Sequence, residues 1–441
     1  MLRVLGNRTY RHLFLAQVVA LIGTGLATVA LGLLAYDIAG ADAGVVLGTA
    51  LAIKMIAYVG VAPVAAAFAE RLPRRRMLVL LDLLRGAVAL SLPFVTEVWQ
   101  VFVLIFVLQS ASAAFTPTFQ ATIPDVLPDE GDYTRALSLS RLAYDMESLV
   151  SPMLAAALLT VVGFHTLFAG TVVGFLASAA LVVSVVLPSP VPGEPRGIYD
   201  RTTRGLRIYL ATPRLRGLLA LSFAVSAAGS MIIVNTVVLV QAGYGLSQQA
   251  TALALAAFGG GSMVAALVLP RLLEAVPDRI AMLSGAAMLA GGLALAAVAA
   301  PGYEMLLGFW LFLGLGYSLT QTPSGRLLRR SSNPEDRPAL FAAQFALSHA
   351  CWLVTYPAAG WLGIRIGMPL TFAVLATVAG GAVLLAAFLW PTGDPDAIEH
   401  VHADLPPDHP HVADAVQAAG GLRHAHAFVI DSHHQDWPRG A

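Results

Sequence analysis

Charge is the first thing that this sequence lacks. Only 12% of its 441 residues are charged, whereas 57% are hydrophobic and the mean hydropathy is +0.75. Because an average soluble domain carries roughly 25% charged residues, this composition excludes an ordinary soluble protein and predicts a polytopic membrane protein in contact with the lipid bilayer. The 26 basic and 26 acidic residues cancel, and the basic ones are scattered over short loops. We therefore expect no nucleic acid or other polyanion as a partner.

Cysteine is nearly absent as well. Cys351 is the single cysteine, so the chain cannot form an internal disulfide, and its place inside an apolar run predicts a small buried core residue. The sequence also has no glycine-rich loop of the kind that cradles phosphate. We therefore expect no ATP-driven step, no cofactor and no enzymatic activity. The basic start of the chain is not followed by a small-residue cleavage site, which predicts a retained first helix rather than a signal peptide.

Long apolar runs, in contrast, fill most of the chain. A transmembrane helix needs about 20 consecutive, mostly apolar residues, and twelve runs reach that length. The sequence therefore predicts an all-α membrane protein with twelve transmembrane helices. The predicted helices cover about residues 13–36, 45–68, 77–96, 98–119, 140–162, 165–187, 216–240, 247–270, 279–300, 303–323, 339–363 and 367–390.

The stretch Ala69–Arg76, which reads AERLPRRR, predicts the orientation of these helices. It connects the second predicted helix to the third and carries four arginines, and short loops rich in Lys and Arg stay in the cytoplasm. On this assignment the cytoplasmic side receives all but three of the 26 basic residues, the exceptions being Lys54, Arg85 and Arg365. We therefore expect both termini in the cytoplasm.

A long, proline-rich and basic loop divides the predicted helices six and six. In addition, a Thr-Pro pair, a Pro-acid-acid run and an Ala-Leu pair recur in the same order in both halves, as expected for parallel repeats related by an axis along the membrane normal. The predicted domains are an N-terminal bundle over 1–187, a cytoplasmic central loop over 188–213, a C-terminal bundle over 214–390 and a tail over 391–441.

Six helices on either side of a long central loop, with a basic loop after the second helix, resemble the major facilitator superfamily. The run LGNRTYRHLFLAQVVALIG resembles the first helix of its bacterial exporter branch, which includes siderophore, macrolide and metal-resistance exporters. The run TPTFQATIPDVLPDEGDYTRALSLSRL is similar to that branch's connection between helices 4 and 5. The resemblance covers about residues 1–390 and implies two six-helix, pseudo-symmetric bundles. The antiporter signature usual in helix 5 is reduced to Ser151-Pro152, so it does not support drug–proton antiport.

The family's loop signature, glycine-x-leucine-x-acid-arginine-x-x-arginine-arginine, is met in part. Ala66 and Pro73 stand where the family has glycine. An acid at the end of helix 2 can accept hydrogen bonds from the next helix or pair with a loop arginine, so we expect a latch that holds the cytoplasmic face in one state. For Arg74, a role in topology alone is an equal alternative. The predicted latch residues are Glu70, Arg71, Arg75 and Arg76.

Ionisable side chains within the predicted helices cost on the order of 2.5–3.5 kcal/mol each on insertion scales, so each requires a partner or a function. Arg85 follows Asp82 by three residues, and Asp145 follows Arg141 by four. Both spacings place the two groups on one helix face and predict ion pairs within the helix.

Glu147 and Lys54 lack such a partner. Glu147 points about 200° around the helix from Asp145 and cannot share its arginine. One interpretation is an ion pair between Lys54 and an acid on another helix; the other is a carboxylate that alternately holds a cation and a proton, with the lysine as competitor. His349 is either a packing residue or a metal ligand and proton carrier. The candidate substrate- and proton-binding residues are thus Asp145, Glu147, His349, Lys54 and Asp82.

The tail contains eight of the eleven histidines and eight acids but no cysteine. Because it is polar and has few large apolar residues, we expect it to be disordered by itself. Histidines two residues apart in an extended chain project to the same side, and nitrogen and oxygen donors without thiolate suit Ni²⁺, Zn²⁺, Co²⁺ or Cu²⁺. The alternative is a tail whose histidines only buffer. The candidate metal ligands are His400, His402, His409, His411, His424, His426, His433 and His434.

A His-rich cytoplasmic tail behind a twelve-helix facilitator body resembles the bacterial nickel-resistance exporters of the NreB type. The resemblance implies a monomeric inner-membrane exporter of nickel, with cobalt next, that works by alternating access, exchanges metal for protons and confers metal resistance. Ni²⁺ is then cargo rather than cofactor. Two alternatives stay open: a proton-coupled exporter of drugs or siderophores from the same superfamily, and a non-transporting metal sensor or chaperone.

Overall fold

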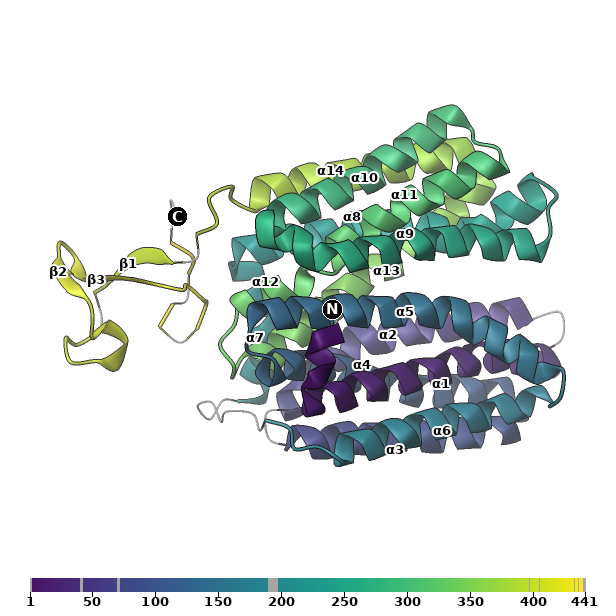
Figure 1. Cartoon of the computed structure of the whole chain (residues 1–441), viewed down its shortest axis with the longest axis horizontal. Helices are drawn as coiled ribbons and strands as arrows, with labels where there is room; N and C mark the ends of the chain where they lie inside the picture. The colour runs from purple at the N-terminus through teal and green to yellow at the C-terminus, as the bar shows by residue number, and fades with distance from the viewer. Residues whose placement is uncertain are drawn as a thin grey trace.

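Two helical bundles lie side by side, and a small β-structure extends from one end of them (Figure 1). This arrangement comes from a computed structural model that describes residues 2–39, 43–69, 72–188, 197–395, 397–403, 405–431, 433–434 and 436–438. We call the end at which the β-structure lies the tail-side end. Helices α3 and α8 begin there, and α4 ends there.

Within the part of the chain that the structure describes, the first bundle holds six long helices, preceded by a short 3₁₀ turn over Leu2–Gly6. Polar caps fix where some of them begin: the Asp129 side chain accepts a hydrogen bond from the Asp132 amide at 2.8 Å, which satisfies a free donor at the start of α5. The helices are α1 (Arg8–Ala39), α2 (Ala43–Ala69), α3 (Arg74–Ser91), α4 (Val98–Val126), α5 (Glu130–Leu159) and α6 (Phe164–Val183).

The second bundle also holds six long helices, and two short helices accompany it. Among the described residues, eleven helices are long and apolar enough to cross a membrane, and α11 packs against α9 and α10 as the twelfth bundle helix. The predicted all-α, twelve-helix fold is therefore confirmed. The elements are α7 (Ile198–Ala211), α8 (Pro213–Val237) with a π-helical end (Val238–Gly243), α9 (Gln248–Ala275), α10 (Asp278–Ala299), α11 (Tyr303–Gln321), α12 (Ser324–Arg330), α13 (Arg337–Ile366) and α14 (Met368–Leu389).

The two bundles repeat one packing scheme. Helix α1 packs on α6 as α8 packs on α14, and α2 packs on α4 as α9 packs on α11. The bundles meet where α5 crosses α9 and where α2 crosses α13, which are equivalent positions in the two repeats. The internal repeat that the sequence predicts is thus present in the helix packing.

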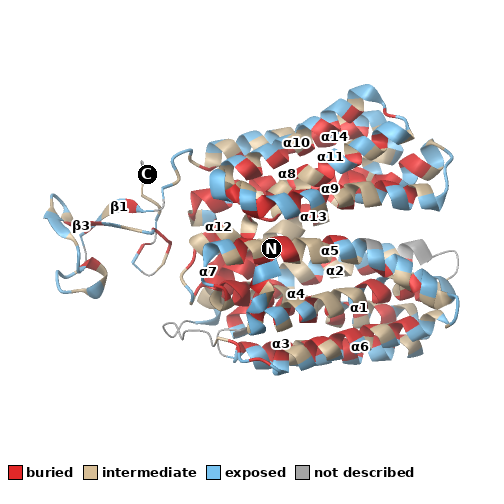
Figure 2. Cartoon of the chain, viewed as in Figure 1, coloured by how far each residue is buried: buried red, intermediate tan, exposed pale blue. Residues whose placement is uncertain are grey.

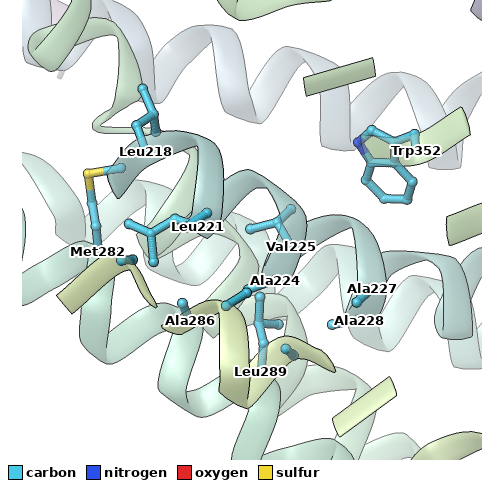
Figure 3. Close-up of a cluster of buried hydrophobic side chains, with 14 of the residues drawn as sticks. Leu218, Leu221, Ala224, Val225, Ala227, Ala228, Met282, Ala286, Leu289 and Trp352 are labelled. Atoms are coloured by element: carbon cyan, nitrogen blue, oxygen red, sulfur yellow. The ribbon is translucent and has the colours of Figure 1, made fainter. Parts of the chain in front are cut away.

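Helix α8 has the largest buried share of the candidate spans because it lies in the middle of its bundle. Its Leu218, Leu221 and Val225 pack with Met282 and Leu289 of α10 (Figure 3). Small residues complete the contact: Ala224, Ala227 and Ala228 on α8 and Ala286 on α10. Such side chains let the helix backbones approach closely, which is the usual basis of helix association in membranes.

The outer faces of the bundles carry many exposed residues (Figure 2), and a large number of the exposed residues are large and apolar. Val298, Ile364 and Phe388 are 88%, 87% and 85% exposed, respectively. Exposed apolar surface on this scale would be unfavourable in water and is compatible with contact with lipid tails. The fold therefore places this protein in a bilayer.

The predicted central loop contains a helix rather than only irregular chain. Helix α7 packs on α13 and α2, and a Cβ on Gly205 would overlap the Ala339 carbonyl, so only glycine allows this approach. The prolines at 190, 192 and 195 lie outside the described residues.

The tail also differs from its prediction, because it holds a three-stranded antiparallel sheet of order β1-β3-β2. The sequence suggests too few apolar residues for independent folding. However, Ile398, Phe428 and Ile430 of the tail join the hydrophobic cluster of the second bundle, so the tail folds against a core that it does not supply. The strands are β1 (Ile398–His402), β2 (Val416–Ala418) and β3 (Gly421–His426).

Candidate functional site

Helix α5 carries a polar group into the contact between the bundles. The predicted Arg141–Asp145 ion pair is present, with the Arg141 Nε atom 3.0 Å from the carboxylate. In addition, the Ser262 hydroxyl of α9 donates to Asp145 at 2.6 Å, and the Arg141 guanidinium lies 5.0 Å from the Tyr317 ring. Asp145 therefore links the two bundles. The sequence offered no signal for Ser262 except its place in a run of small residues.

A second group lies where α2 meets α13. The Tyr58 ring contacts the His349 ring edge-on with centroids 4.7 Å apart, and the Lys54 ammonium lies 5.5 Å from the Tyr58 centroid. His349 Nδ1 lies 2.7 Å from the Phe345 carbonyl. Since a carbonyl only accepts, Nδ1 carries the proton, which leaves the Nε2 lone pair available to bind a proton or a cation.

Glu147 lies on α5, and its carboxylate packs against α1, because a Cβ on Gly25 would lie 2.6 Å from its Oε1 atom. Neither Lys54 nor Glu147 has an ion-pair partner within 4.0 Å among the described residues. The structure thus brings Lys54 and His349, two of the five candidate residues, together around Tyr58 where α2 meets α13.

Asp82 lies elsewhere, inside the first bundle. It pairs with Arg85 as predicted and accepts a hydrogen bond from Ser178 at 2.8 Å. The Arg85 guanidinium lies between the Phe115 and Phe175 rings, 4.0 and 4.5 Å from their centroids. Its side-chain partners therefore all belong to the first bundle, and this position favours a role in stability over a role in binding.

We expect Asp82→Ala to lower the free energy of unfolding by about 3–5 kcal/mol, because it leaves the Arg85 charge buried without its carboxylate. Denaturant-dependent unfolding of the purified protein in detergent measures this loss. Asp132→Ala is the control, since its pair with Arg135 is partly exposed and contributes at most about 1 kcal/mol. Equal losses for the two variants would contradict the assignment.

The predicted latch is only partly described. Glu70 and Arg71 lie outside the described residues, Arg76 is exposed, and Arg75 donates to the Val185 carbonyl at 3.4 Å within its own bundle. A role in topology alone was an equal alternative for Arg74; its buried guanidinium makes an ion pair with the partly buried carboxylate of Asp125.

Asp125 extends this contact across the bundles, because it also pairs with Arg337 of α13. Nearby, Arg326 of α12 reaches Glu130 at 2.6 Å and the Thr134 hydroxyl at 2.6 Å, both on α5. The tail-side ends of the bundles are therefore held together by ion pairs. The sequence did not reveal them, because their members lie far apart along the chain.

The tail sheet aligns four histidines on one face. His400 and His402 lie on β1, His424 and His426 lie on β3, and His400 is directly opposite His424. Two further histidines, His411 and His434, approach from the segments before and after β3. Two overlapping sets of four ligand atoms result, each with all atoms within 4.8 Å: His400, His411, His424 and His426; and His400, His402, His411 and His434.

The Nε2 atoms of His402 and His434 lie 3.1 and 3.0 Å from Nε2 of His400. Backbone carbonyls lie 3.0 Å from Nδ1 of His400 and 2.9 Å from Nδ1 of His426, and the Asp431 carboxylate lies 2.9 Å from Nδ1 of His434. Such outer partners fix the tautomer of metal-binding histidines. Burial alone would raise the pKa of Asp431, but hydrogen bonds from His434 and from two backbone amides outweigh it and lower this pKa to about 2.

The Nε2 atoms of His411, His424 and His426 are buried and have no hydrogen-bond partner among the residues that the structure describes. Burial and the neighbouring imidazoles also lower the pKa of His400 and of His411 to about 4, so both rings are neutral at pH 7. Ligands on one ion at about 2.0–2.1 Å lie at most about 4.2 Å apart, so a small inward shift would suffice. The donor set fits a divalent transition metal. His409 and His433 lie outside both sets but contact the His411 ring.

Comparison with known proteins establishes the family. The model of the Major Facilitator Superfamily matches residues 13–274 and 218–412. This chain belongs to that superfamily. Members of the family are transporters rather than enzymes, so the expected absence of enzymatic activity agrees with the family. The human organic anion transporter MFSD10 (TETRAN) has a similar fold, with a TM-score of 0.75 and 12% identity over 86% of this chain and 99% of that one.

Two bacterial relatives are similar in sequence over shorter stretches. Macrolide efflux protein A of Enterococcus faecalis is 26% identical over 152 residues, which is 32% of this chain and 47% of the relative. The uncharacterized transporter YfiS of Bacillus subtilis is 26% identical over 120 residues, 27% of this chain and 28% of the relative. The matched stretches thus span less than half of each relative.

The tail of this transporter is attached to the second bundle through Arg214, the second residue of α8. Its guanidinium donates to Asp394 at 3.0 Å and to the Phe428 carbonyl at 3.3 Å, and lies 5.1 Å from the Trp437 ring. Asp431, which orients His434, also accepts from Asn333 before α13 at 3.4 Å. The histidine centre is thus joined to the transporter body by hydrogen bonds.

We expect Arg214→Ala to release the tail, because it removes two charge-assisted hydrogen bonds and an aromatic contact together. Cleavage by trypsin after Arg423 in β3 should become at least about tenfold faster. Arg216→Ala is the matched control, since Arg216 is exposed two residues further along α8. The same cleavage rate in both variants would contradict this attachment.

Proposed function

We propose that this transporter exports divalent transition-metal ions, nickel first and cobalt next, in exchange for protons. The single observation that supports it is the set of buried, unpaired imidazole nitrogens that converge in the tail. A nitrogen lone pair buried without a donor is unfavourable, and a metal ion satisfies several of them at once. The donor set by itself does not discriminate among Ni²⁺, Co²⁺, Zn²⁺ and Cu²⁺. We name nickel first because of the resemblance to nickel-resistance exporters.

In this proposal Glu147, His349 and Lys54 take part in moving the ion across the membrane. Glu147 exchanges the cation for a proton, His349 offers its Nε2 lone pair, and Lys54 competes with the cation for the carboxylate. The bundles open alternately at either end around this group. Both termini and the tail lie in the cytoplasm of a bacterial inner-membrane protein that acts as a monomer, and the tail gathers metal at the inner mouth.

A second candidate is the export of organic compounds. The named relatives favour it, since two of the three are called a macrolide efflux protein and an organic anion transporter, and none is called a metal transporter. Aromatic rings also lie at the contact between the bundles, where Tyr58 of α2 meets Phe345 of α13, and such rings suit an apolar substrate. The histidines of the tail would then sense metal ions rather than deliver them to the transport pathway.

Growth of cells that carry the full chain in graded Ni²⁺, Co²⁺, Zn²⁺ and Cu²⁺, and separately in macrolides, distinguishes the two candidates. Metal export predicts tolerance of one or two of these ions together with lower cellular metal. Tolerance of macrolides without any change in metal tolerance would overturn the metal proposal and support the second candidate.

A chain that ends at Pro391 provides a further prediction. We expect it to transport metal but to confer weaker tolerance of metal. The proposed transport residues Glu147, His349 and Lys54 remain in this chain, whereas the histidines of the tail are lost. Metal accumulation in cells with either chain measures the difference. Identical tolerance for the two chains would contradict a role of the tail in supply.

A further inference from the structure

A cavity of about 360 Å³ lies between the bundles at the tail-side end. Residues of both bundles and of the start of the central loop line it. The complete lining therefore exists only while the tail-side ends of the bundles are together. Its size falls within the range of about 300–1,000 Å³ that is usual for small-ligand sites. The lining residues are Arg74, Pro124, Asp125, Pro128, Pro188, Arg329, Pro334 and Arg337.

The charge of this lining is strongly positive. Three guanidinium groups face a single carboxylate, that of Asp125, which already pairs with both Arg74 and Arg337. The guanidinium of Arg337 is also close enough to those of Arg74 and Arg329 for their charges to act on it. Counted over its described residues, the lining therefore has a formal charge of two positive units.

Two guanidinium nitrogens of this lining are buried and have no hydrogen-bond acceptor within the described parts of the chain. They are Nε of Arg337, whose side chain is 9% exposed, and Nη1 of Arg329, whose other terminal nitrogen donates to the Pro128 carbonyl. Each such donor is costly without an acceptor. The remaining walls are four prolines, which have no amide N–H, so arginine side chains are the principal donors that the lining offers.

We propose that this cavity binds a phosphate-class anion, either a free phosphate group or the headgroup of an anionic lipid. Guanidinium groups match phosphate oxygens in a forked geometry, and a phosphate dianion would balance the two excess charges. Because Arg74 belongs to the first bundle and Arg329 and Arg337 to the second, the bound anion bridges the bundles. It therefore stabilises the state in which their tail-side ends are together.

Binding is tested on the purified full chain in maltoside detergent, with inorganic phosphate as the calorimetric titrant. We expect saturable binding that weakens about tenfold or more in Arg329→Gln and in Arg337→Gln, since each removes a charged donor. Arg271→Gln, an exposed arginine at the end of α9, is the control and should bind as the wild type does.

The variant Asp125→Asn distinguishes a specific loss of phosphate binding from a loss of folding. It removes the carboxylate that competes for Arg74 and Arg337, so phosphate should bind about tenfold more tightly, and a damaged protein would not gain affinity. Absence of phosphate binding and of headgroup binding in the wild type, or affinities unchanged in both arginine variants, would overturn the proposal.

Two further arms identify the source and the effect of the anion. Phosphatidylglycerol added without phosphate should compete with later phosphate if a lipid headgroup is the ligand, whereas no competition assigns the site to a free phosphate group. Spin labels at Arg76→Cys and Arg216→Cys, in a Cys351→Ser background, report the separation of the tail-side ends. We expect phosphate to shorten this separation, and an unchanged distance would refute the bridging role.

Discussion

His411→Ala should weaken the binding of Ni²⁺ to the full-length protein by about 100-fold or more, and His400→Ala should do the same. Both residues belong to each of the two four-histidine sets, so the loss of either leaves no complete set. Both rings are neutral at pH 7 because their pKa values are lowered to about 4, so they compete for metal without first losing a proton. Calorimetric titration of purified protein with Ni²⁺ gives the affinity.

His433→Ala is the matched control for these variants. His433 contacts the His411 ring but belongs to neither set, so its removal should change the affinity by less than about tenfold. If His411→Ala binds Ni²⁺ as tightly as His433→Ala does, the histidine centre is not the metal site, and the observation that supports metal export is lost.

Glu147→Gln should reduce metal efflux to the level of vesicles that lack the protein. The amide has nearly the shape of the carboxyl, but it neither binds a proton near neutral pH nor balances a cation. Because Glu147 has no ion-pair partner within 4.0 Å among the described residues, the variant should keep the stability of the wild type, unlike Asp82→Ala. Metal movement in proteoliposomes under an imposed acid gradient measures the effect.

Glu274→Gln, at an exposed position near the end of α9, is the control and should transport at the wild-type rate. Wild-type efflux by Glu147→Gln would remove this carboxylate from the mechanism. In that case His349 alone would have to take part in proton exchange, and a His349→Gln variant in the same vesicles would test it.

Contacts within one helix were predictable, whereas contacts between helices were not. The pairs Asp82–Arg85 and Arg141–Asp145 follow from spacings of three and four residues, because the helix itself brings such side chains together. Ser262 reaches Asp145 from 117 residues away, and Arg337 reaches Asp125 from 212 residues away. No local pattern encodes those distances, so the sequence did not predict the pairing of Arg74 and Arg337 with Asp125, while the latch at Glu70, Arg71, Arg75 and Arg76 stays a prediction.

The tail also combines features that the local sequence predicts with features that depend on tertiary contacts. Its composition predicted candidate metal ligands, which stay a prediction, and the spacing of His400 and His402 placed both on one side of an extended chain, as β1 has them. Its folding was not predictable from the tail alone, because Phe428 and Ile430 complete their core with residues of the second bundle. A segment that is too polar to fold by itself can still fold against an existing apolar surface.

The sequence by itself determined the membrane class, the twelve helices and their grouping into two repeats, since these depend on apolar runs and basic loops that act locally. Only the tertiary structure decided which charges meet between the bundles, which histidines share a centre, and that three arginines surround a cavity at the tail-side end. The physical reason is that these groups act over a few ångströms in space, and helix packing alone sets those separations.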